Sequence, residues 1–316
     1  MVDNPLVSVV MPAYNAAAYI DEAVESMLAQ TYQNWELLIA DDASTDSTKA
    51  VLGKYQDPRI LFFHNEKNLG YQSTCNKLFA LCKGDFITFL DADDYCPANR
   101  LSLLLAPFAQ NPNLGMVGSA YHIVDNDKNL IDTVYKPLTY AEIREHLPKE
   151  SAFCGATIMF SRRVYETVGG YRDFFKNYAY QDYDWSYCIA DKFESINLAE
   201  PLYSYRQSPE SNSKKISAQR FVSDKIVQYL GNQRATRGKD DIETQNLTAL
   251  NDFVKKLLAP FEADTSLIYR QYAAVFMYNK LYKKAKNAAW QAIKLNPTQL
   301  INYRTWFYCF RKSLFK

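Results

Sequence analysis

Short apolar runs alternate with amphipathic segments along the first hundred residues, and this alternation limits the fold more than any other feature. The apolar runs are typical of buried strands and lie at residues 6–11, 36–40, 59–63 and 86–90. Segments with helical spacing separate these runs. The first covers about residues 17–30, the second begins at about residue 44, and the third covers residues 71–81. Strands that alternate with helices form a largely parallel, doubly wound sheet. We therefore expect an α/β domain with its functional loops at the carboxyl ends of the strands.

The acidic run Asp91-Ala-Asp-Asp94 directly follows the fourth apolar run. Three carboxylates within four residues repel one another, and an oxygen-preferring divalent cation, Mg²⁺ or Mn²⁺, would stabilise them. The alternative is a solvated acidic turn that caps a helix starting near Pro97. The other strand ends favour the cation, because they also have residues suited to a nucleotide.

The loops after the first two strands suit a nucleobase. After the second strand, an Asp of the pair Asp41-Asp42 could accept the N3 proton of uracil or thymine, with helix capping as the alternative use. Tyr14 follows the first strand and offers a ring for base stacking, although an ordinary exposed aromatic would look the same. We also expect Ser44 or Thr45 to cap a helix.

Six motifs resemble, in order and spacing, those of the family 2 inverting glycosyltransferases with the GT-A fold. They are Pro12-Ala-Tyr-Asn15, Asp41-Asp-Ala-Ser-Thr-Asp46, Asn68-Leu-Gly70, Asn76, Lys83-Gly-Asp85 and Asp91-Ala-Asp-Asp94. The resemblance implies a nucleotide-sugar donor, with UDP as the nucleotide and Mn²⁺ or Mg²⁺ as cofactor. It implies that Asp42 contacts the base, Asp91 lies near the ribose, Asp93 binds the metal and Asp94 is structural. The implied donor-binding residues are Pro12, Tyr14, Asn15, Asp42, Asn68, Gly70, Asp91 and Arg206.

A looser resemblance continues beyond the acidic run. Residues 153–160 have the pattern of a strand with a Gly-containing loop before it, and residues 161–170 that of a short helix ended by glycine. Gln181-Asp-Tyr-Asp-Trp185 opens a helix to about Lys192 and resembles the Glu-Asp pair of the family, which implies that Asp182 is the catalytic base. Gln181, Asp184 and Trp185 are further candidates on the acceptor side. A charge favoured by the helix dipole is the alternative role of Asp182.

Three positions depart from the family pattern. Ala43 occupies a position where the family has Gly, which is tolerated unless the backbone needs a positive φ angle. Gln181 replaces a Glu, and Ser208 replaces a His that often helps to bind the metal or the diphosphate. These departures leave Asp42, Asp93 and Asp182 in place.

Composition agrees with a soluble enzyme, although it does not identify one, and it predicts no nucleic-acid partner. The chain has 316 residues with 36 basic and 35 acidic side chains, and so lacks the broad basic surface of a nucleic-acid binder. Its six cysteines lack CxxC spacing and we recognise no signal peptide, which predicts a cytoplasmic location. We find neither a membrane-spanning apolar run nor the Gln-x-x-Arg-Trp motif of processive synthases. We therefore expect an enzyme that adds one sugar per encounter.

The pattern changes after about residue 213 to helical spacing alone. We predict a catalytic domain at 1–213 and a helical domain at 214–316, in which residues 282–297 resemble the second helix of a tetratricopeptide repeat. In the last helix Tyr303, Trp306, Phe307, Phe310 and Leu314 share one face. Such a face is typical of packing in a helical bundle or of a helix in a membrane interface.

Taken together, these features predict a metal-dependent, non-processive inverting glycosyltransferase. It would transfer a sugar from a UDP donor to a glycan or lipid-linked acceptor, with peripheral contact at the inner face of the cell membrane through the C-terminal helix as an option. A catalytically inactive sugar-nucleotide sensor or scaffold remains an alternative, supported by Gln181 and Ser208. A nucleotidyltransferase is a second alternative, although we find no Gly-rich triphosphate loop near the first strand.

Overall fold

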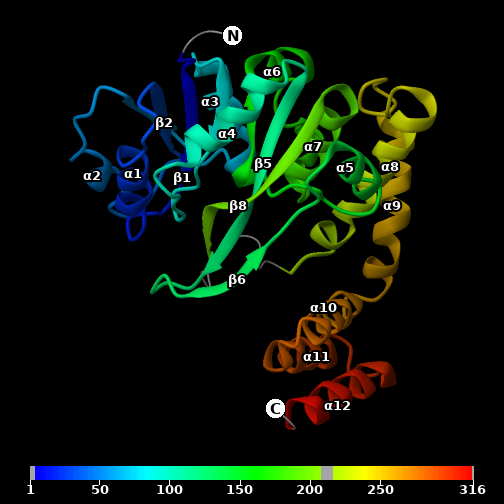
Figure 1. Ribbon diagram of the computed structural model, residues 1–316. Coiled ribbons are helices and arrows are strands. Elements are labelled where there is room, and N and C mark those ends of the chain that lie inside the picture. Colours follow the sequence, from blue (N-terminus) through cyan, green and yellow to red (C-terminus); the bar gives the residue numbers. More distant parts are fainter. Residues whose placement is uncertain (1–3, 208–215, 315–316) are drawn as a thin grey trace. The chain divides into compact units, whose positions relative to one another are not determined.

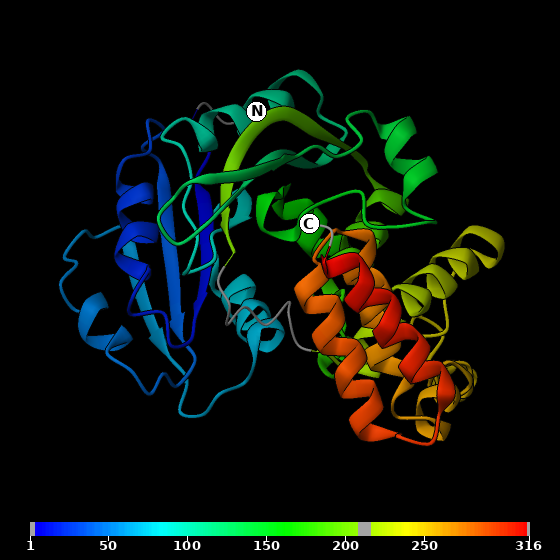
Figure 2. The same ribbon diagram turned by 90° about the horizontal axis from the view of Figure 1, so that it is seen from below.

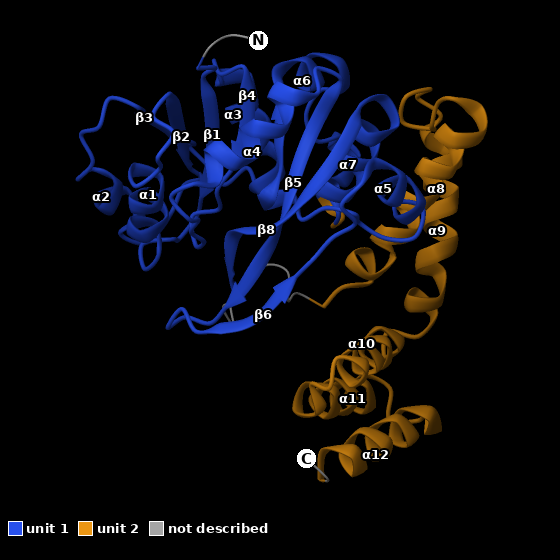
Figure 3. Ribbon diagram, in the orientation of Figure 1, with its two compact units in different colours: residues 1–176, 180–209 blue, residues 177–179, 210–316 orange. Residues whose placement is uncertain are grey.

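The structure, a computed structural model, describes residues 4–207 and 216–314, and the chain divides into two compact units (Figure 3). The first comprises residues 1–176 and 180–209, and the second residues 177–179 and 210–316. The boundary expected at 213/214 and the departure at Ser208 both fall outside the described residues. Each unit is treated below as a separate body.

Within the described residues, eight strands of the first unit form one mixed sheet with the order β3-β2-β1-β4-β7-β5-β6, and β8 pairs with β5 (Figure 1). The strands are β1 (Val7–Ala13), β2 (Trp35–Asp41), β3 (Ile60–His64), β4 (Phe86–Phe89), β5 (Leu114–Val124), β6 (Leu130–Val134), β7 (Met159–Ser161) and β8 (Glu194–Arg206). β1 to β4 run parallel, as the alternating pattern predicts. β7 is antiparallel to β4 and β5, and β8 is parallel to β5.

Helices of the first unit pack on the two faces of this sheet. They are α1 (Ile20–Leu28), α2 (Thr48–Leu52), α3 (Tyr71–Leu81), α4 (Arg100–Gln110), α5 (Tyr140–His146), α6 (Arg162–Val168) and α7 (Gln181–Lys192), with short 3₁₀ turns at Gly155–Thr157 and Asp173–Asn177. Alternate residues of β1 and β2, such as Val9 and Leu37, pack with buried residues of α1 and α4. An aromatic cluster that includes Phe79 of α3, Phe89 of β4 and Trp185 of α7 forms a second part of the core.

Two predicted elements differ from the structure. The helix expected from Ser44 or Thr45 begins at Thr48, because Asp46 Oδ1 accepts hydrogen bonds from the backbone N–H and the hydroxyl of Thr48. The strand expected within residues 153–160 is shorter, since Gly155–Thr157 forms a 3₁₀ turn and β7 begins only at Met159. The first difference leaves residues 43–47 as a loop beside the strand ends.

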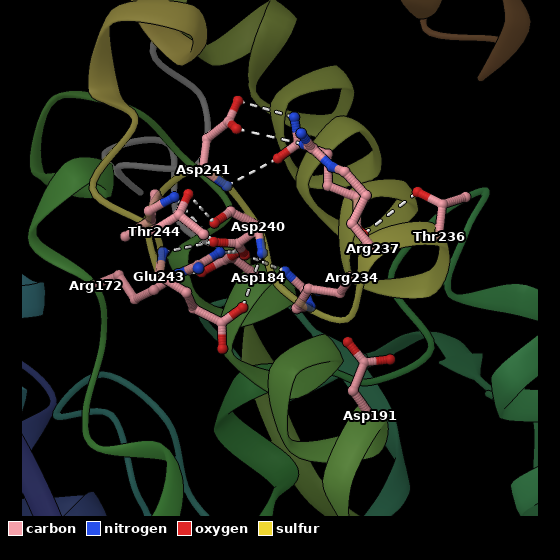
Figure 4. Close-up of polar contacts among 12 residues, drawn as sticks. Arg172, Asp184, Asp191, Arg234, Thr236, Arg237, Asp240, Asp241, Glu243 and Thr244 are labelled. Atoms are coloured by element: carbon pink, nitrogen blue, oxygen red, sulfur yellow. Dashed lines mark hydrogen bonds and ion pairs between the residues drawn. The ribbon is translucent and has the colours of Figure 1, made fainter.

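The described part of the second unit is helical. It contains α8 (Ala218–Arg237), α9 (Leu247–Ala263), α10 (Leu267–Tyr278), α11 (Tyr282–Leu295) and α12 (Leu300–Leu314). Two buried carboxylates order the turn after α8 (Figure 4): Asp240 Oδ2 lies 2.7 Å from Nη1 of Arg234, and Asp241 Oδ2 accepts a hydrogen bond of 2.8 Å from Gln233. No described helix is both long and apolar enough to cross a membrane.

Candidate active site

Four neighbouring loops meet at the carboxyl edge of the parallel strands β3, β2, β1 and β4 (Figure 3). In the sheet register Asp41 of β2 lies opposite Ala13 of β1 and His64 of β3. Parallel strands that end at the same level bring their following loops together. The predicted base-contacting residue Asp42 and the acidic residue Asp91 therefore lie at the same edge of the sheet.

Asp42 is buried and organises the loop after β3. Its Oδ1 accepts hydrogen bonds from Asn65 Nδ2 at 2.7 Å and the Leu69 N–H at 2.9 Å, and its Oδ2 accepts one from the Gly70 N–H at 2.9 Å. A carboxylate has about four acceptor positions, so one remains. Asn68 Oδ1 also accepts from the Gly70 N–H, at 3.0 Å, which places the predicted Asn68-Leu-Gly70 motif directly on Asp42.

The loop after β1 is joined to the loop after β2. Asn15 Oδ1 accepts hydrogen bonds from the Thr45 N–H at 2.8 Å and the Thr45 hydroxyl at 3.3 Å, and the Asn15 N–H donates to Ser44 Oγ at 2.9 Å. Pro12 is half-buried within β1, whereas the Tyr14 side chain is 49% exposed. Asn15 thus fixes the loop, and Tyr14 leaves a ring face available for a ligand.

Ala43 lies in the left-handed region, with φ of 59°. We expected Ala to be tolerated here unless the backbone needs a positive φ angle, and the backbone does have a positive φ angle. The Cβ of an L residue costs free energy in this region, and Gly avoids that cost. Because the Ser44 N–H donates to Asp41 Oδ1 at 3.1 Å, the loop keeps this geometry despite the cost.

Two of the motifs have structural roles. A Cβ at Gly84 would lie 2.5 Å from the backbone N of Ser8, so Lys83-Gly-Asp85 needs glycine for close packing of β1 against the start of β4. Asn76 exchanges two hydrogen bonds of 2.8 Å with the backbone of Tyr171. These residues hold the scaffold of the site together.

Asp91 and Asp94 both have pKa values raised by burial and by the neighbouring carboxylates. Partial burial and the neighbouring charge of Asp93 raise the pKa of Asp91 to about 7, and the charge of Asp182 contributes to this increase. Asp91 Oδ1 accepts a hydrogen bond from the Tyr71 hydroxyl at 2.9 Å, and the Asp91 N–H donates to the Tyr203 hydroxyl at 3.0 Å. A clustered set of carboxylates with a raised pKa marks a candidate functional site.

Asp93 and Asp94 have different environments. Asp94 is 1% exposed and its Oδ1 accepts the Arg206 N–H at 2.7 Å, so it joins the acidic turn to the end of β8. Asp93 is partly exposed, and no other described residue donates a hydrogen bond to its carboxylate. Burial raises the pKa of Asp93, which the positive charge of Arg206 opposes. Asp93 thus differs from Asp91 and Asp94, each of which accepts a hydrogen bond from another described residue.

The donor set fits a divalent ion that the substrate helps to bind. The described residues include no group of three or more His, Cys, Asp or Glu side chains arranged around a metal. Mg²⁺ and similar ions commonly use one or two carboxylates together with substrate phosphates and water. Asp93, with Asp91 two residues before it, offers that smaller set.

Arg206 is buried beneath the acidic turn. Its Nε donates to the Asp93 carbonyl at 2.9 Å, its Nη1 to the Asn126 carbonyl at 3.0 Å, and its Nη2 pairs with Glu22. The Arg206 side chain is 2% exposed. Every nitrogen of the guanidinium already has a protein partner, so this geometry favours a positioning role for Arg206 over direct contact with a diphosphate.

Asp182 lies in the first turn of α7 against the 3₁₀ turn at Gly155–Thr157. A Cβ at Gly155 would lie 2.8 Å from the Asp182 Cβ and 2.9 Å from its Oδ2. Only glycine leaves room for the Asp182 carboxylate in this position. Since the charge of Asp182 also raises the pKa of Asp91, the two carboxylates belong to one electrostatic cluster.

The other acceptor-side candidates have structural partners. Asp184 is fully buried, and its Oδ2 accepts a hydrogen bond of 2.7 Å from Arg172 Nε in an ion pair (Figure 4). The Trp185 ring is 1% exposed and packs in the aromatic cluster with Phe160, at 4.8 Å between centroids. Neither side chain is available to a substrate, whereas Gln181 is partly exposed at the start of α7.

Several residues of the site were not among the site candidates chosen from the sequence. Tyr71 and Tyr203 contact Asp91, and Glu22 holds Arg206. His64 is a further example, with its Nδ1 3.0 Å from Asp41 Oδ2. These partners are far apart along the chain, so only the folded structure brings them together.

The fold is the GT-A fold, and comparison with known proteins gives the family. A family model described as "Glycosyl transferase family 2" matches residues 8–169. The chain is 31% identical to the "Putative glycosyltransferase EpsE" of Bacillus subtilis over 219 residues, which cover 67% of this chain and 76% of EpsE. The chain therefore belongs to glycosyl transferase family 2, as the motif series predicted.

Two further similarities extend this result. The chain is 31% identical to the chondroitin synthase of Escherichia coli over 264 residues, which cover 82% of this chain but 37% of that longer protein. A crystal structure of S. aureus TarS residues 1–349 in complex with UDP-GlcNAc superposes with a TM-score of 0.62 and 17% identity, over 97% of this chain and 92% of that one. At this identity the match confirms the predicted fold class.

Proposed function

We propose that the protein is a non-processive inverting glycosyltransferase of polysaccharide biosynthesis, which transfers a sugar from a UDP donor to a glycan or lipid-linked acceptor. The observation that supports this most is the position of Asp182. Its carboxylate lies against Gly155 and acts electrostatically on Asp91 at the strand ends. A base candidate thus neighbours the carboxylates that would hold the diphosphate.

The donor nucleotide would bind over the loops after β1 and β2. Asp42 has one acceptor position left for the N3–H of uracil, and the exposed Tyr14 ring could stack on the base. Asn15, Asn68 and Gly70 would hold these loops in place. The TarS structure determined with UDP-GlcNAc, which shares the fold, supports a uridine nucleotide.

Asp93 would hold a Mn²⁺ or Mg²⁺ ion together with the donor diphosphate. When bound, such an ion offsets the negative charge that develops on a departing diphosphate. Arg206 would assist from below, since it fixes the Asp93 carbonyl and the Asp94 carboxylate. Asp91 would lie near the ribose, with its orientation set by Tyr71.

The reaction would be a single displacement. The acceptor hydroxyl would transfer its proton to the Asp182 carboxylate while its oxygen attacks the anomeric carbon. The bond from that carbon to the phosphate oxygen would break, and its electron pair would leave with UDP. Attack from the face opposite the leaving group inverts the anomeric configuration. The N-terminus of α7 stabilises the negative charge on Asp182 before the proton arrives.

We propose a cytoplasmic location, because all six cysteines are free and nucleotide-sugar chemistry does not require an oxidising compartment. The similarity to chondroitin synthase supports a polysaccharide as the product. Contact with the cell membrane would bring the enzyme to a lipid-linked acceptor.

The test is product release from a panel of nucleotide-sugars, with candidate acceptors and Mn²⁺. We expect release of UDP and a product with inverted anomeric configuration, measured from the anomeric coupling in NMR spectra. Release of pyrophosphate would instead indicate a nucleotidyltransferase. Binding of a UDP-sugar without any release would indicate a sensor, and retention of configuration would exclude a single displacement.

A further inference from the structure

The C-terminal helices have a one-sided charge. From residue 265 to the end the chain has ten Lys and Arg side chains and no Asp or Glu, although the whole protein has a net charge of only +1. The preceding 264 residues contain 26 basic and 35 acidic side chains, a net charge of −9. Within the described part of the chain, no carboxylate pairs with the exposed basic side chains of α11 and α12. Their positive charge is therefore not neutralised locally.

The α12 helix has one inner face and one outer face. Asn302 and Cys309 are buried, and Cys309 packs with Ala273 of α10 and Ala285 and Ala289 of α11. The opposite side exposes large apolar side chains between arginines. The apolar and aromatic residues of this side are Leu300 (73% exposed), Tyr303, Phe307 (58% exposed), Tyr308 and Leu314, and the arginines are Arg304 and Arg311.

The predicted aromatic face of the last helix is thus divided between two uses. Trp306 and Phe310 are partly buried, and Trp306 packs on the small core of α10 to α12. Tyr303, Phe307 and Leu314 point outward. Packing within the helical unit therefore uses only part of the apolar surface, and the exposed part needs a separate explanation.

Helix α11 extends this surface. It lies alongside α12 (Figure 2), with the Trp290 and Trp306 rings 5.9 Å apart. Lys286 Nζ lies 6.0 Å from the centroid of the Phe310 ring. Lys283 and Lys294 are exposed and share one helical face with Trp290. We call the exposed residues of these two helices, Lys283, Trp290, Lys294, Leu300, Tyr303, Arg304, Phe307, Tyr308, Arg311 and Leu314, the α11–α12 face.

We propose that the α11–α12 face docks on an anionic lipid bilayer, with its aromatic and aliphatic side chains in the headgroup region and its cations among lipid phosphates. Interfacial helices combine Trp, Phe and Leu with Lys and Arg in this way. Basic residues near an anionic leaflet each add to the attraction. A groove of about 510 Å³ between α10 and α12, lined by Arg304, Tyr308 and Met277 among others, offers room for an apolar group beside the cations.

Two other occupants fit the face less well. A soluble polyanion would use the arginines, but it gives no reason for exposed aliphatic side chains such as Leu300 and Leu314. A second copy of the chain would bring two positive faces together, which repel each other. The inference does not depend on the proposed glycosyl transfer, and its test uses no activity measurement.

The test is sedimentation of the full chain with phosphatidylcholine vesicles, with and without phosphatidylglycerol. We expect binding only to the anionic vesicles, with an affinity that falls as salt rises. The double variant Arg304→Glu with Arg311→Glu should weaken binding at least about 25-fold, because each basic residue near an anionic surface increases the affinity about fivefold. Leu300→Ser with Phe307→Ser should also weaken it. Lys49→Glu with Lys192→Glu, the same charge change at exposed sites of the first unit, should have little effect.

These substitutions lie on exposed positions, so the buried contacts of Asn302 and Cys309 remain intact. Lack of binding to anionic vesicles would overturn the proposal, as would equal losses in the control variant. A different result would be binding of inorganic polyphosphate that is as strong as binding of anionic vesicles, with no loss in Leu300→Ser with Phe307→Ser. That result would identify a soluble polyanion as the occupant. Self-association of the free protein that Phe307→Ser abolishes would identify a second copy as the occupant.

Discussion

Replacement of Ala43 by Gly should stabilise the protein, although it removes a side chain. Ala43 has φ of 59°, a left-handed conformation that costs an L residue about 1 to 2 kcal/mol. Glycine removes this cost, but it adds entropy to the unfolded chain worth about 0.4 to 1 kcal/mol. The balance is a gain of about 0.5 to 1 kcal/mol in the free energy of unfolding of the first unit.

The matched control is Ala50→Gly. Ala50 is exposed in the middle of α2, where the same change should cost about 1 kcal/mol because glycine disfavours a helix. For a unit of this size, thermal unfolding should show an increase of about 1 to 4 °C in Tm for Ala43→Gly and a decrease of about 2 to 4 °C for Ala50→Gly. A decrease for both variants would refute the assignment of backbone strain at Ala43.

Three further predictions concern the donor site. Calorimetry should show that the wild type binds UDP more tightly with Mn²⁺ than with a chelator and that Asp93→Asn removes this difference; equal affinities in the wild type would exclude a metal at Asp93. The wild type should prefer uridine to cytidine nucleotides and Asp42→Asn should lose that preference, whereas equal binding of both nucleotides by the wild type would count against base recognition by Asp42. Arg206→Ala should lower the free energy of unfolding by about 2 to 4 kcal/mol, because it leaves the Asp93 and Asn126 carbonyls without their donor while Glu22 keeps its ion pair with Lys128, and an unchanged urea midpoint would contradict this.

Local patterns predicted the elements whose ends depend on nearby residues. Residues 71–81 and 181–192 were predicted as helices, and α3 and α7 have these bounds. The start of α2 was predicted too early, because Ser44 and Thr45 are used by Asn15 from another loop. A partner 30 residues away cannot be found from local spacing.

Strands that depend on distant packing were not predicted. Sequence analysis identified neither β5 nor the full length of β8, which pair along most of their lengths. A Cβ at Gly115 would lie 2.4 Å from the Phe193 Cβ, and one at Gly118 would lie 2.2 Å from Asn197 Oδ1. Glycine usually weakens a strand pattern, but here it allows this close pairing.

The motif series identified the carboxylates of the site, but it did not give their environments. Asp42, Asp91 and Asp93 all lie at the carboxyl edge of the sheet, as expected for a doubly wound fold. The fold around α7 gives the two carboxylates different environments. Asp184 forms an ion pair with Arg172, whereas Asp182 lies against Gly155. The structure thus distinguishes two carboxylates that the sequence leaves equivalent.

The most direct test of the account is the transfer rate of Asp182→Asn, measured beside its affinity for the nucleotide-sugar. A general base acts mainly in the transition state, so transfer should fall by about 10² to 10⁴-fold while donor affinity changes only a few-fold. Asp173→Asn, an exposed carboxylate in the 3₁₀ turn before α7, should leave both values unchanged. Full transfer activity in Asp182→Asn would contradict the account.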